Sequence, residues 1–221
     1  MSTDPRRCPT MVPTVRVLGR ALAPALAYAQ HAEHVPDPSG RPSMTSSETV
    51  VLLADDGTRT GTADKATVHT ATTPLHLAFS CHLLGDDGRV LVTRRALAKR
   101  TWPGVWTNSV CGHPGPDESF EDAILRRSRF ELGVEVADVE VVVPDFRYRA
   151  VDASGVVENE ICPVFTARAL SPVRPNPDEV MDLAWVTPAQ LRDAVRAMPF
   201  ALSPWLVQHA AGLPLLAEVG A

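Results

Sequence analysis

Short apolar runs separated by turn signals fill the chain from Thr49 onward, and this alternation limits the folds that the chain can adopt. The runs with the length and residue types of β-strands lie at 50–54, 76–84, 90–93, 106–111, 139–143, 146–150, 156–166 and 183–186. Residues 85–88, with the sequence GDDG, predict a hairpin between the second and third runs. The pattern predicts a sheet built from many short strands.

Three segments carry the signals of helices, at 117–132, 187–198 and 203–212. Gly133 follows the first and suits the left-handed cap that ends many helices. Thr187 and Gln190 have the spacing of a capping box, with Pro188 at the first helical position. Helices placed between strands predict an α/β (α+β) fold, a single domain with helices packed on a mixed sheet.

Composition excludes several classes of protein. The 221 residues carry a net charge of −5 and are 45% hydrophobic, which suits a globular domain and lacks the basic excess of a nucleic-acid-binding protein. No stretch reaches the ~18–20 apolar residues that span a bilayer, so we expect no membrane segment. The cysteines Cys8, Cys81, Cys111 and Cys162 are far apart and form no CxxC pair, which predicts free thiols and a cytoplasmic location.

Residues 1–47 differ from the rest of the chain. They hold seven prolines, few acidic residues and the start of a Ser/Thr-rich stretch at 43–49. We expect a disordered extension. The alternatives are a misassigned start, with Met44 as the true first residue, and an arginine-rich targeting peptide, with export ranked last. The expected domain covers 48–215, and 216–221 form a C-terminal tail.

Histidines and glutamates have a spacing that suits a divalent-metal site. Glu158 and Glu160 lie two apart in a strand-like run, so their side chains share one face. Carboxylates among apolar neighbours need a partner or a cation. Together with His69, His76 and His113 they make a credible metal site, although a lone histidine is more often an ordinary core or surface residue.

Four basic residues are candidates for phosphate binding: Lys65, Arg95, Lys99 and Arg127. Each of them, taken alone, is more often a solvated surface charge. The chain has two lysines against nineteen arginines, and both lysines belong to this set.

The helix predicted at 117–132 and its flanks fit the frame of a Nudix box. The matching positions are Gly112, Glu118, Arg126, Glu131, Gly133 and Val134. Boxes of that family end in Arg-Glu-apolar-x-Glu-Glu-x-Gly, and their glutamates hold the magnesium used in diphosphate hydrolysis. Residues 126–133 have the sequence RRSRFELG, so most of those glutamates are missing. The resemblance implies a Nudix-like mixed β-sheet sandwiched by helices, without the hydrolytic site.

Longer matching runs narrow the resemblance. They lie at 76–80, 93–97, 102–114, 145–150 and 158–160. The run at 102–114, WPGVWTNSVCGHP, is ungapped and the most specific. Over 49–205 the chain resembles the type I isopentenyl-diphosphate isomerases. This implies an isomerase of isoprenoid biosynthesis that interconverts isopentenyl diphosphate and dimethylallyl diphosphate by protonation and deprotonation. A Nudix-type diphosphohydrolase and a metal- or nucleotide-binding module without catalysis are the alternatives.

The resemblance also implies roles for individual residues. One divalent cation, Mn²⁺ or Mg²⁺ with Zn²⁺ as the alternative, would be held by His69, His76, His113, Glu158 and Glu160. The substrate diphosphate would be bound by Lys65, Arg95, Lys99 and Arg127. Glu131 would hold a Mg²⁺ together with the diphosphate. The proton-transfer pair would be Cys111 and Glu160, with Tyr148 assisting and Trp205 facing the hydrocarbon.

The expected chemistry accounts for these residue types. Protonating an isolated alkene gives a tertiary carbocation, so the reaction needs a positioned acid, a base across the five-carbon unit and a pocket without water. The aromatic face of Trp205 would stabilise the cation by ~2 kcal/mol or more. The expected partner is a small diphosphate, and the protein would be a monomer or a weak homodimer. Cys81-His82 and Pro116-Asp117 depart from the pattern and receive no role.

Overall fold

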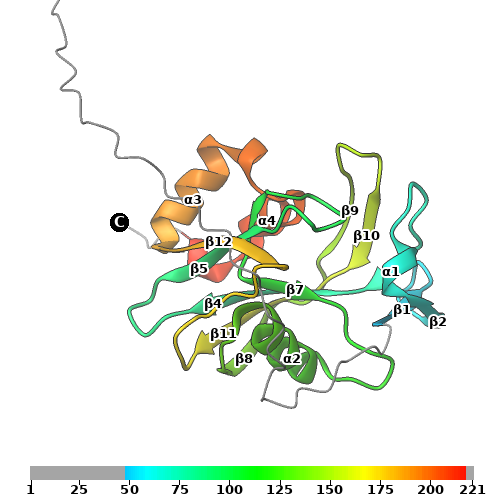
Figure 1. Ribbon diagram of the computed structural model, residues 1–221, viewed down its shortest axis with the longest axis horizontal. Helices are drawn as coiled ribbons and strands as arrows, with labels where there is room; N and C mark the ends of the chain where they lie inside the picture. Colours follow the sequence, from blue (N-terminus) through cyan, green and yellow to red (C-terminus); the bar gives the residue numbers. More distant parts are fainter. Residues whose placement is uncertain (1–47, 218–221) are drawn as a thin grey trace, which may run out of the picture. The chain divides into compact units, whose positions relative to one another are not determined.

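Two mixed β-sheets form the framework of the chain, whose computed structural model describes residues 48–217 (Figure 1). The first sheet has the strand order β2 (Arg59–Asp64), β1 (Thr49–Leu53), β3 (His76–Leu77), β10 (Val157–Ile161) and β9 (Arg147–Val151). The second has the order β12 (Val180–Val186), β5 (Val90–Arg95), β4 (Phe79–Leu84), β11 (Val164–Ala169) and β8 (Val136–Val143). β6 (Trp106–Thr107) pairs with β5, and β7 (Val110–Gly112) pairs with β4.

Helices cover both faces of the second sheet. The helices of the described chain are α1 (Lys65–Val68), α2 (Phe120–Leu132), α3 (Pro188–Ala197) and α4 (Pro204–His209), with 3-10 turns at Pro199–Ala201, Ala210–Gly212 and Pro214–Leu216. Leu91 of β5 packs in one apolar cluster with Ile124 of α2. Its neighbour Val90 packs in another cluster with Leu191 of α3 and Leu206 of α4. Successive strand residues point to opposite faces, so the sheet separates α2 from α3 and α4.

The predicted fold class is confirmed, but two predicted single strands each divide between the sheets. The run at 76–84 breaks at Ala78 into β3 and β4, and the run at 156–166 breaks before Pro163 into β10 and β11. Pro163 has no backbone N–H to donate, which favours a break there. The two crossings lie side by side, because Ala78 N donates to Ile161 O (3.0 Å) and Ser80 N donates to Pro163 O (3.2 Å).

The strand predicted at 106–111 also divides, into β6 and β7. The predicted hairpin forms, with Leu84 paired to Val90, but its strands then separate. β6 and β7 pair with β5 and β4 along the separated parts. Between β6 and β7, Ser109 Oγ donates to Leu91 O (2.6 Å) and accepts from Leu83 N (2.7 Å), so one hydroxyl ties the two hairpin strands together.

Helix ends follow the predicted capping residues closely. α3 has the predicted capping box of Thr187 and Gln190. α2 ends at Gly133 as predicted, with φ 57°, and a Cβ there would lie 2.7 Å from the carbonyl oxygen of Arg174. Its start is Phe120 and not residue 117, because the Ser119 side chain caps the helix by accepting from Asp122 N.

Strand β2 and helix α1 were not predicted. β2 is largely exposed and lacks an apolar alternation, and α1 is a single turn that begins after the capping side chain of Asp64. Leu216, expected in the C-terminal tail, is buried against the α3–α4 side of the core. The hypotheses for residues 1–47 lie outside the described residues. Among residues 48–217, no helix combines the length and apolar character needed to cross a membrane.

Candidate active site

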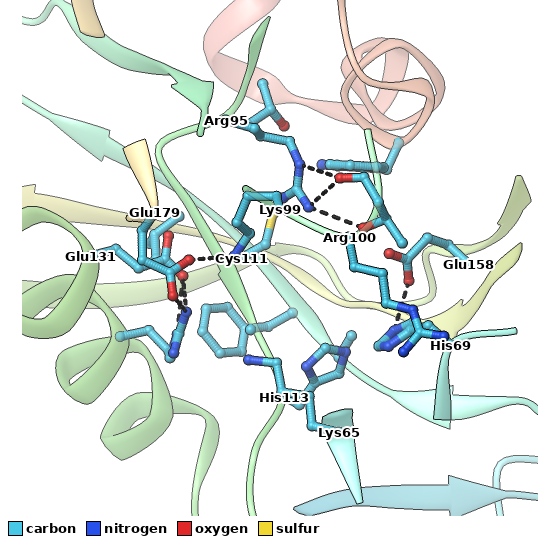
Figure 2. A pocket seen from close by; sticks show the side chains of 18 of the residues that line it. Lys65, His69, Arg95, Lys99, Arg100, Cys111, His113, Glu131, Glu158 and Glu179 are labelled. Carbon is cyan, nitrogen blue, oxygen red and sulfur yellow. Dashed lines mark hydrogen bonds and ion pairs between the residues drawn. The ribbon is translucent and has the colours of Figure 1, made fainter. Parts of the chain in front are cut away.

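One cavity of about 590 Å³ collects side chains from both sheets and from α2 and α4 (Figure 2). The predicted site residues that line it are Lys65, His69, Arg95, Lys99, Cys111, His113, Arg127, Glu131, Tyr148, Glu158, Glu160 and Trp205. His76, the remaining one, is fully buried and contacts Glu160. In Figure 2, Glu131 and Glu179 lie on one side of the cavity, and His69 and Glu158 lie on the other.

Three imidazoles and one carboxylate meet at the second of these sides. Ligand atoms of His69, His76, His113 and Glu160 all lie within 4.8 Å of one another. The ring centroids are 5.1 to 5.7 Å apart. Strand register produces this contact, because Glu160 of β10 lies beside His76 of β3 on one flank and beside Tyr148 of β9 on the other.

The imidazole nitrogens of this cluster are oriented toward a shared centre. His76 Nδ1 donates to the carbonyl of Pro74 (2.9 Å), which leaves the lone pair of its Nε2 free. Among the described residues, Nε2 of His69 and Nε2 of His76 are buried and form no hydrogen bond. They lie 3.2 Å and 3.3 Å from oxygens of Glu158 and Glu160. Buried polar atoms without partners are rare, and this donor set fits a divalent cation.

His76 and His113, which both contact Oε1 of Glu160, have pKa values shifted in opposite directions. Burial acts to lower the pKa of His76, but Glu160 outweighs it and the net pKa is raised. Burial lowers the pKa of His113 to about 3, although the same carboxylate opposes the shift. Burial would raise the pKa of Glu160, yet the neighbouring imidazoles of His113 and His76 bring it well below the ordinary value.

Glu158 shares a face with Glu160, as predicted, but stands apart from the four-residue group. Both glutamates are buried in β10, while Asn159 between them is partly exposed. Glu158 Oε2 contacts His69 at 3.2 Å. Glu158 therefore supports the cluster through His69.

The opposite side of the cavity holds three paired cations. Lys65 pairs with Glu48, and Lys99 pairs with Glu179. Arg127 pairs with Glu131 and with Glu48, the latter at 2.9 Å, and lies 3.6 Å from Glu179. Burial acts to raise the pKa of Glu48, but the charges of Lys65 and Arg127 lower it to about 2. Three carboxylates thus neutralise three cations in this part of the cavity.

Arg95 differs from the other three cations. Its guanidinium donates to the carbonyl and hydroxyl of Thr101 at 2.7 to 3.0 Å, and it lies 5.5 Å from the ring centroid of Trp205. These partners carry no negative charge. Arg95 therefore places a positive charge against the Trp205 ring.

The thiol of Cys111 faces the same cavity from β7. Ser80 Oγ lies 3.5 Å from its Sγ, and Asn108 Nδ2 donates to the sulfur at 3.2 Å. Burial raises the pKa of the thiol to about 11, with the Ser80 and Asn108 bonds opposing the shift. The group is therefore a protonated thiol at neutral pH, while Glu160 is an ionised carboxylate.

Aromatic rings close the cavity around the thiol. Tyr148 and Trp205 are buried, with ring centroids 5.8 Å apart. Trp102 meets Trp205 edge-on at 5.4 Å and has φ 45°, a conformation that non-glycine residues rarely adopt. Burial also raises the pKa of Tyr148 well above its ordinary value, so its hydroxyl stays protonated.

Comparison with known proteins shows the family to which this chain belongs. The NUDIX domain profile matches residues 74–206. A protein of Agromyces mediolanus named isopentenyl-diphosphate Delta-isomerase is 63% identical over 172 residues, which cover 78% of this chain and 84% of the relative. A protein of Kocuria rhizophila with the same name is 64% identical over 72% of this chain and 88% of its own. The chain belongs to the isopentenyl-diphosphate Delta-isomerase family.

A solved structure shares the overall fold of this isomerase family member. Protein DR0079 of Deinococcus radiodurans superposes with a TM-score of 0.58 over 74% of this chain and 98% of its own, at 19% identity. That identity shows a common fold alone. The resemblance stated from the sequence is therefore confirmed at the level of both family and fold.

Three surviving positions of the Nudix frame, Gly112, Glu118 and Arg126, have structural roles in this isomerase family member. Glu118 holds Arg126 through two bonds of 2.7 Å, and it accepts from Gly115 N (2.9 Å), which fixes the loop before α2. A Cβ on Gly112 would lie 2.8 Å from the Arg127 side chain, so glycine lets β7 approach α2 closely. On the cavity side, α2 presents Arg127 and the single carboxylate of Glu131.

Polar side chains that contact predicted site residues, but were not themselves predicted, include Glu48, Ser80, Asn108 and Glu179. Asn108 lies inside the specific run at 102–114, so the run itself was a usable signal. Glu48 and Glu179 carry no signal in the sequence, since only folding brings them to the lysines.

Proposed function

We propose that this chain is an isopentenyl-diphosphate isomerase that moves the double bond of a five-carbon diphosphate by adding one proton and removing another. One observation carries the proposal. The thiol of Cys111 and the carboxylate of Glu160, which come from different sheets, line one cavity whose other side is cationic. The names of the curated relatives favour the isomerase over the hydrolase.

The cationic side would receive the diphosphate. Lys65, Lys99 and Arg127 would exchange their carboxylate partners for phosphate oxygens, with Arg95 reaching from the aromatic wall. Glu131 would hold a Mg²⁺ that offsets the repulsion between phosphate and carboxylate oxygens. Anchoring the charged end supplies the binding energy that positions an otherwise unreactive hydrocarbon.

The hydrocarbon would then lie against Cys111, Glu160 and the aromatic rings. A protonated thiol and an ionised carboxylate are the acid and the base that the reaction needs, and either can serve first depending on its direction. Trp205 would face the carbocation, and its burial beside Tyr148 excludes water that would capture the cation. The Tyr148 hydroxyl would assist the proton transfer.

The histidine cluster would hold one divalent cation, Mn²⁺ or Mg²⁺ with Zn²⁺ as the alternative. The residues that fit this role are His69, His76, His113 and Glu160, with Glu158 next to His69. When bound, such a cation would orient Glu160 and tune its basicity. The buried nitrogens that lack hydrogen bonds within the described chain support this assignment.

The reaction requires a reduced thiol, which favours the cytoplasm. Cys81, Cys111 and Cys162 are all free. We infer a cytoplasmic enzyme that acts on a small diphosphate, as a monomer or a weak homodimer, with residues 48–217, which include the buried Leu216, as its catalytic domain.

Proton NMR in deuterated water tests the function directly. Protein incubated with isopentenyl diphosphate and Mg²⁺ is expected to produce dimethylallyl diphosphate that contains deuterium. Cys111→Ser and Glu160→Gln should each lower kcat by about 10² or more, the usual scale for losing a positioned acid or base. Cys81→Ser, which removes a buried thiol outside the cavity, is the control. Release of phosphate or pyrophosphate without isomer would instead indicate a hydrolase.

A further inference from the structure

Asn108 is a fully buried amide between β6 and β7, at the point where the predicted strand divides. Its side chain contacts two functional groups of the cavity. Trp205 Nε1 donates to Asn108 Oδ1 at 3.0 Å. Cys111 Sγ lies within hydrogen-bond distance of both ends of the amide, because Asn108 Nδ2 donates to it at 3.2 Å and the thiol donates to Asn108 Oδ1 at 3.4 Å. One amide thus touches both the thiol and the indole.

Surrounding groups fix which end of this amide faces which partner. Nδ2 donates to the carbonyl oxygens of Cys81 (3.2 Å) and Val110 (2.9 Å), which can only accept. Oδ1 accepts from Trp205 Nε1 and from Thr107 Oγ1 (2.9 Å). An inverted amide would place donor against donor and acceptor against acceptor, so the observed orientation is the one that satisfies all four partners.

The amide is also tied to the helix that carries Trp205. Thr107 Oγ1 lies 2.8 Å from Ser203 Oγ, and the Ser203 side chain caps α4 by accepting from Leu206 N. Ser203 N donates to the carbonyl of Trp106 (2.8 Å). The start of α4 is therefore bonded to β6, and Asn108 carries the connection on to the thiol of β7.

We propose that Asn108 is a positioning residue of the isomerisation, which sets the Cys111 thiol and the Trp205 indole in a fixed arrangement around the substrate hydrocarbon. The proposal rests on the proposed function. The acid and the ring that faces the carbocation lie on different elements. A side chain that contacts both can hold them within about 0.5 Å of a productive geometry. Displacement by about 1 Å can lower a rate by about 10²-fold.

Ser109 offers a matched control. It is the next residue and is also fully buried, but the hydrogen bonds of its hydroxyl go to backbone groups of Leu83 and Leu91 rather than to Cys111 or Trp205. Asn108→Asp and Asn108→Ala provide two different losses. Aspartate keeps the oxygen that accepts from Trp205 and from the Cys111 thiol but loses the amide donor, whereas alanine loses all of these contacts.

The kinetic test compares kcat with KM for isopentenyl diphosphate in the metal-loaded, full-length protein. Both Asn108 variants are expected to lower kcat by about 10- to 100-fold while KM changes by less than about threefold, because the cationic side is untouched. Ser109→Ala should keep kcat within about threefold of the wild type, even if its melting temperature falls. Unchanged kcat in folded Asn108→Ala, or an equal loss in Ser109→Ala, would overturn the proposal.

A second readout does not depend on turnover. In protein with ¹⁵N-labelled tryptophan, the Trp205 indole N–H signal can be assigned by its loss in Trp205→Phe. It should move upfield in Asn108→Ala, which removes its acceptor, and stay nearly in place in Asn108→Asp and Ser109→Ala. An unmoved signal in Asn108→Ala contradicts the role of Asn108. If the wild type itself forms no isomer, the proposed function fails, while the indole signal still reports on the contact.

Discussion

The two sides of the cavity reach electrostatic balance in opposite ways. On the histidine side, three imidazoles gather at one carboxylate, and buried Nε2 atoms of His69 and His76 form no hydrogen bond within the described chain. On the cationic side, Lys65, Lys99 and Arg127 each have a carboxylate partner. The first side is incomplete without a ligand, and the second is complete without one.

Each side therefore places a different demand on its ligand. A cation entering the histidine side supplies a missing partner, so its binding should stabilise the fold. A diphosphate entering the cationic side must displace carboxylates that are already bonded, so much of its gain is offset by the lost pairs. Removing the metal should therefore lower the free energy of unfolding. Replacing a basic side chain of the cationic side should mainly weaken substrate binding.

Metal removal tests the first half of this comparison and should have the largest effect on stability. With free metal about 1,000-fold above its Kd, the free energy of unfolding should exceed that of chelated protein by about 4 kcal/mol. His113→Gln should abolish the metal-dependent part, and Lys99→Met should retain it. Denaturant unfolding with and without chelator measures both. Equal unfolding curves for the wild type would refute a structural cation at the cluster.

A second group of buried imidazoles differs from the metal cluster, because no carboxylate among the described residues contributes to its pKa shifts. His82 and His209 are buried with their Nε2 atoms 3.0 Å apart. Burial lowers the pKa of His82 to about 4 and lowers that of His209 well below its ordinary value of 6.5. The unfolded chain takes up protons first, so the free energy of unfolding should fall as pH drops from about 6.5 to about 4, by about 3 kcal/mol for His82 alone.

The variant that tests this acid sensitivity carries His82→Leu and His209→Leu together. Unfolding of the variant and of the wild type is measured in the presence of a chelator across the pH range. Metal release then does not contribute to the pH dependence of stability. The variant should lose less stability on acidification than the wild type. Parallel pH curves would show that other groups cause the acid sensitivity.

Lys99→Met tests the cationic side, with a smaller effect. KM for the diphosphate substrate should rise about tenfold, equivalent to about 1.4 kcal/mol, while kcat changes by less than about twofold. Stability should change little, since Glu179 keeps Arg127 at 3.6 Å. Arg89→Met, which breaks the exposed pair with Asp87, is the control and should leave KM unchanged. A large loss of stability in Lys99→Met would contradict the view that this side is balanced without its ligand.

Deleting residues 1–43 should have the smallest effect. The deletion keeps Glu48, which pairs with Lys65 and Arg127, and so leaves both sides of the cavity intact. Activity and melting temperature are expected to stay nearly the same. A marked fall in either would show that the extension contributes to the catalytic domain.

Much of the fold was predictable because its signals are local. The hairpin at 85–88, the capping box at Thr187 and the glycine cap at Gly133 depend on residues close in sequence, and all three form as predicted. The breaks at Ala78 and before Pro163 were missed, because apolar composition continues through both. Only the packing of one strand pair beside the other shows where the chain leaves the first sheet for the second.

The site, like the fold, was predictable from the sequence only in part. Family resemblance singled out the residues that the fold brings to one cavity, including the lysines. It did not indicate that Glu48 and Glu179 would pair with those lysines, or that Asn108 would join Cys111 to Trp205. Such contacts join residues up to 97 positions apart, and side-chain chemistry alone does not reveal which distant partner is met.

Motifs and capping signals act over short stretches of chain, so the family, the fold class and the candidate residues could be inferred from the amino-acid sequence. Tertiary structure alone decided that the thiol and the carboxylate come from different sheets and face one cavity. It also decided which half of that cavity is satisfied without a ligand. The physical reason is that hydrogen bonds and ion pairs depend on distances between atoms, and those distances exist only once the strands have paired.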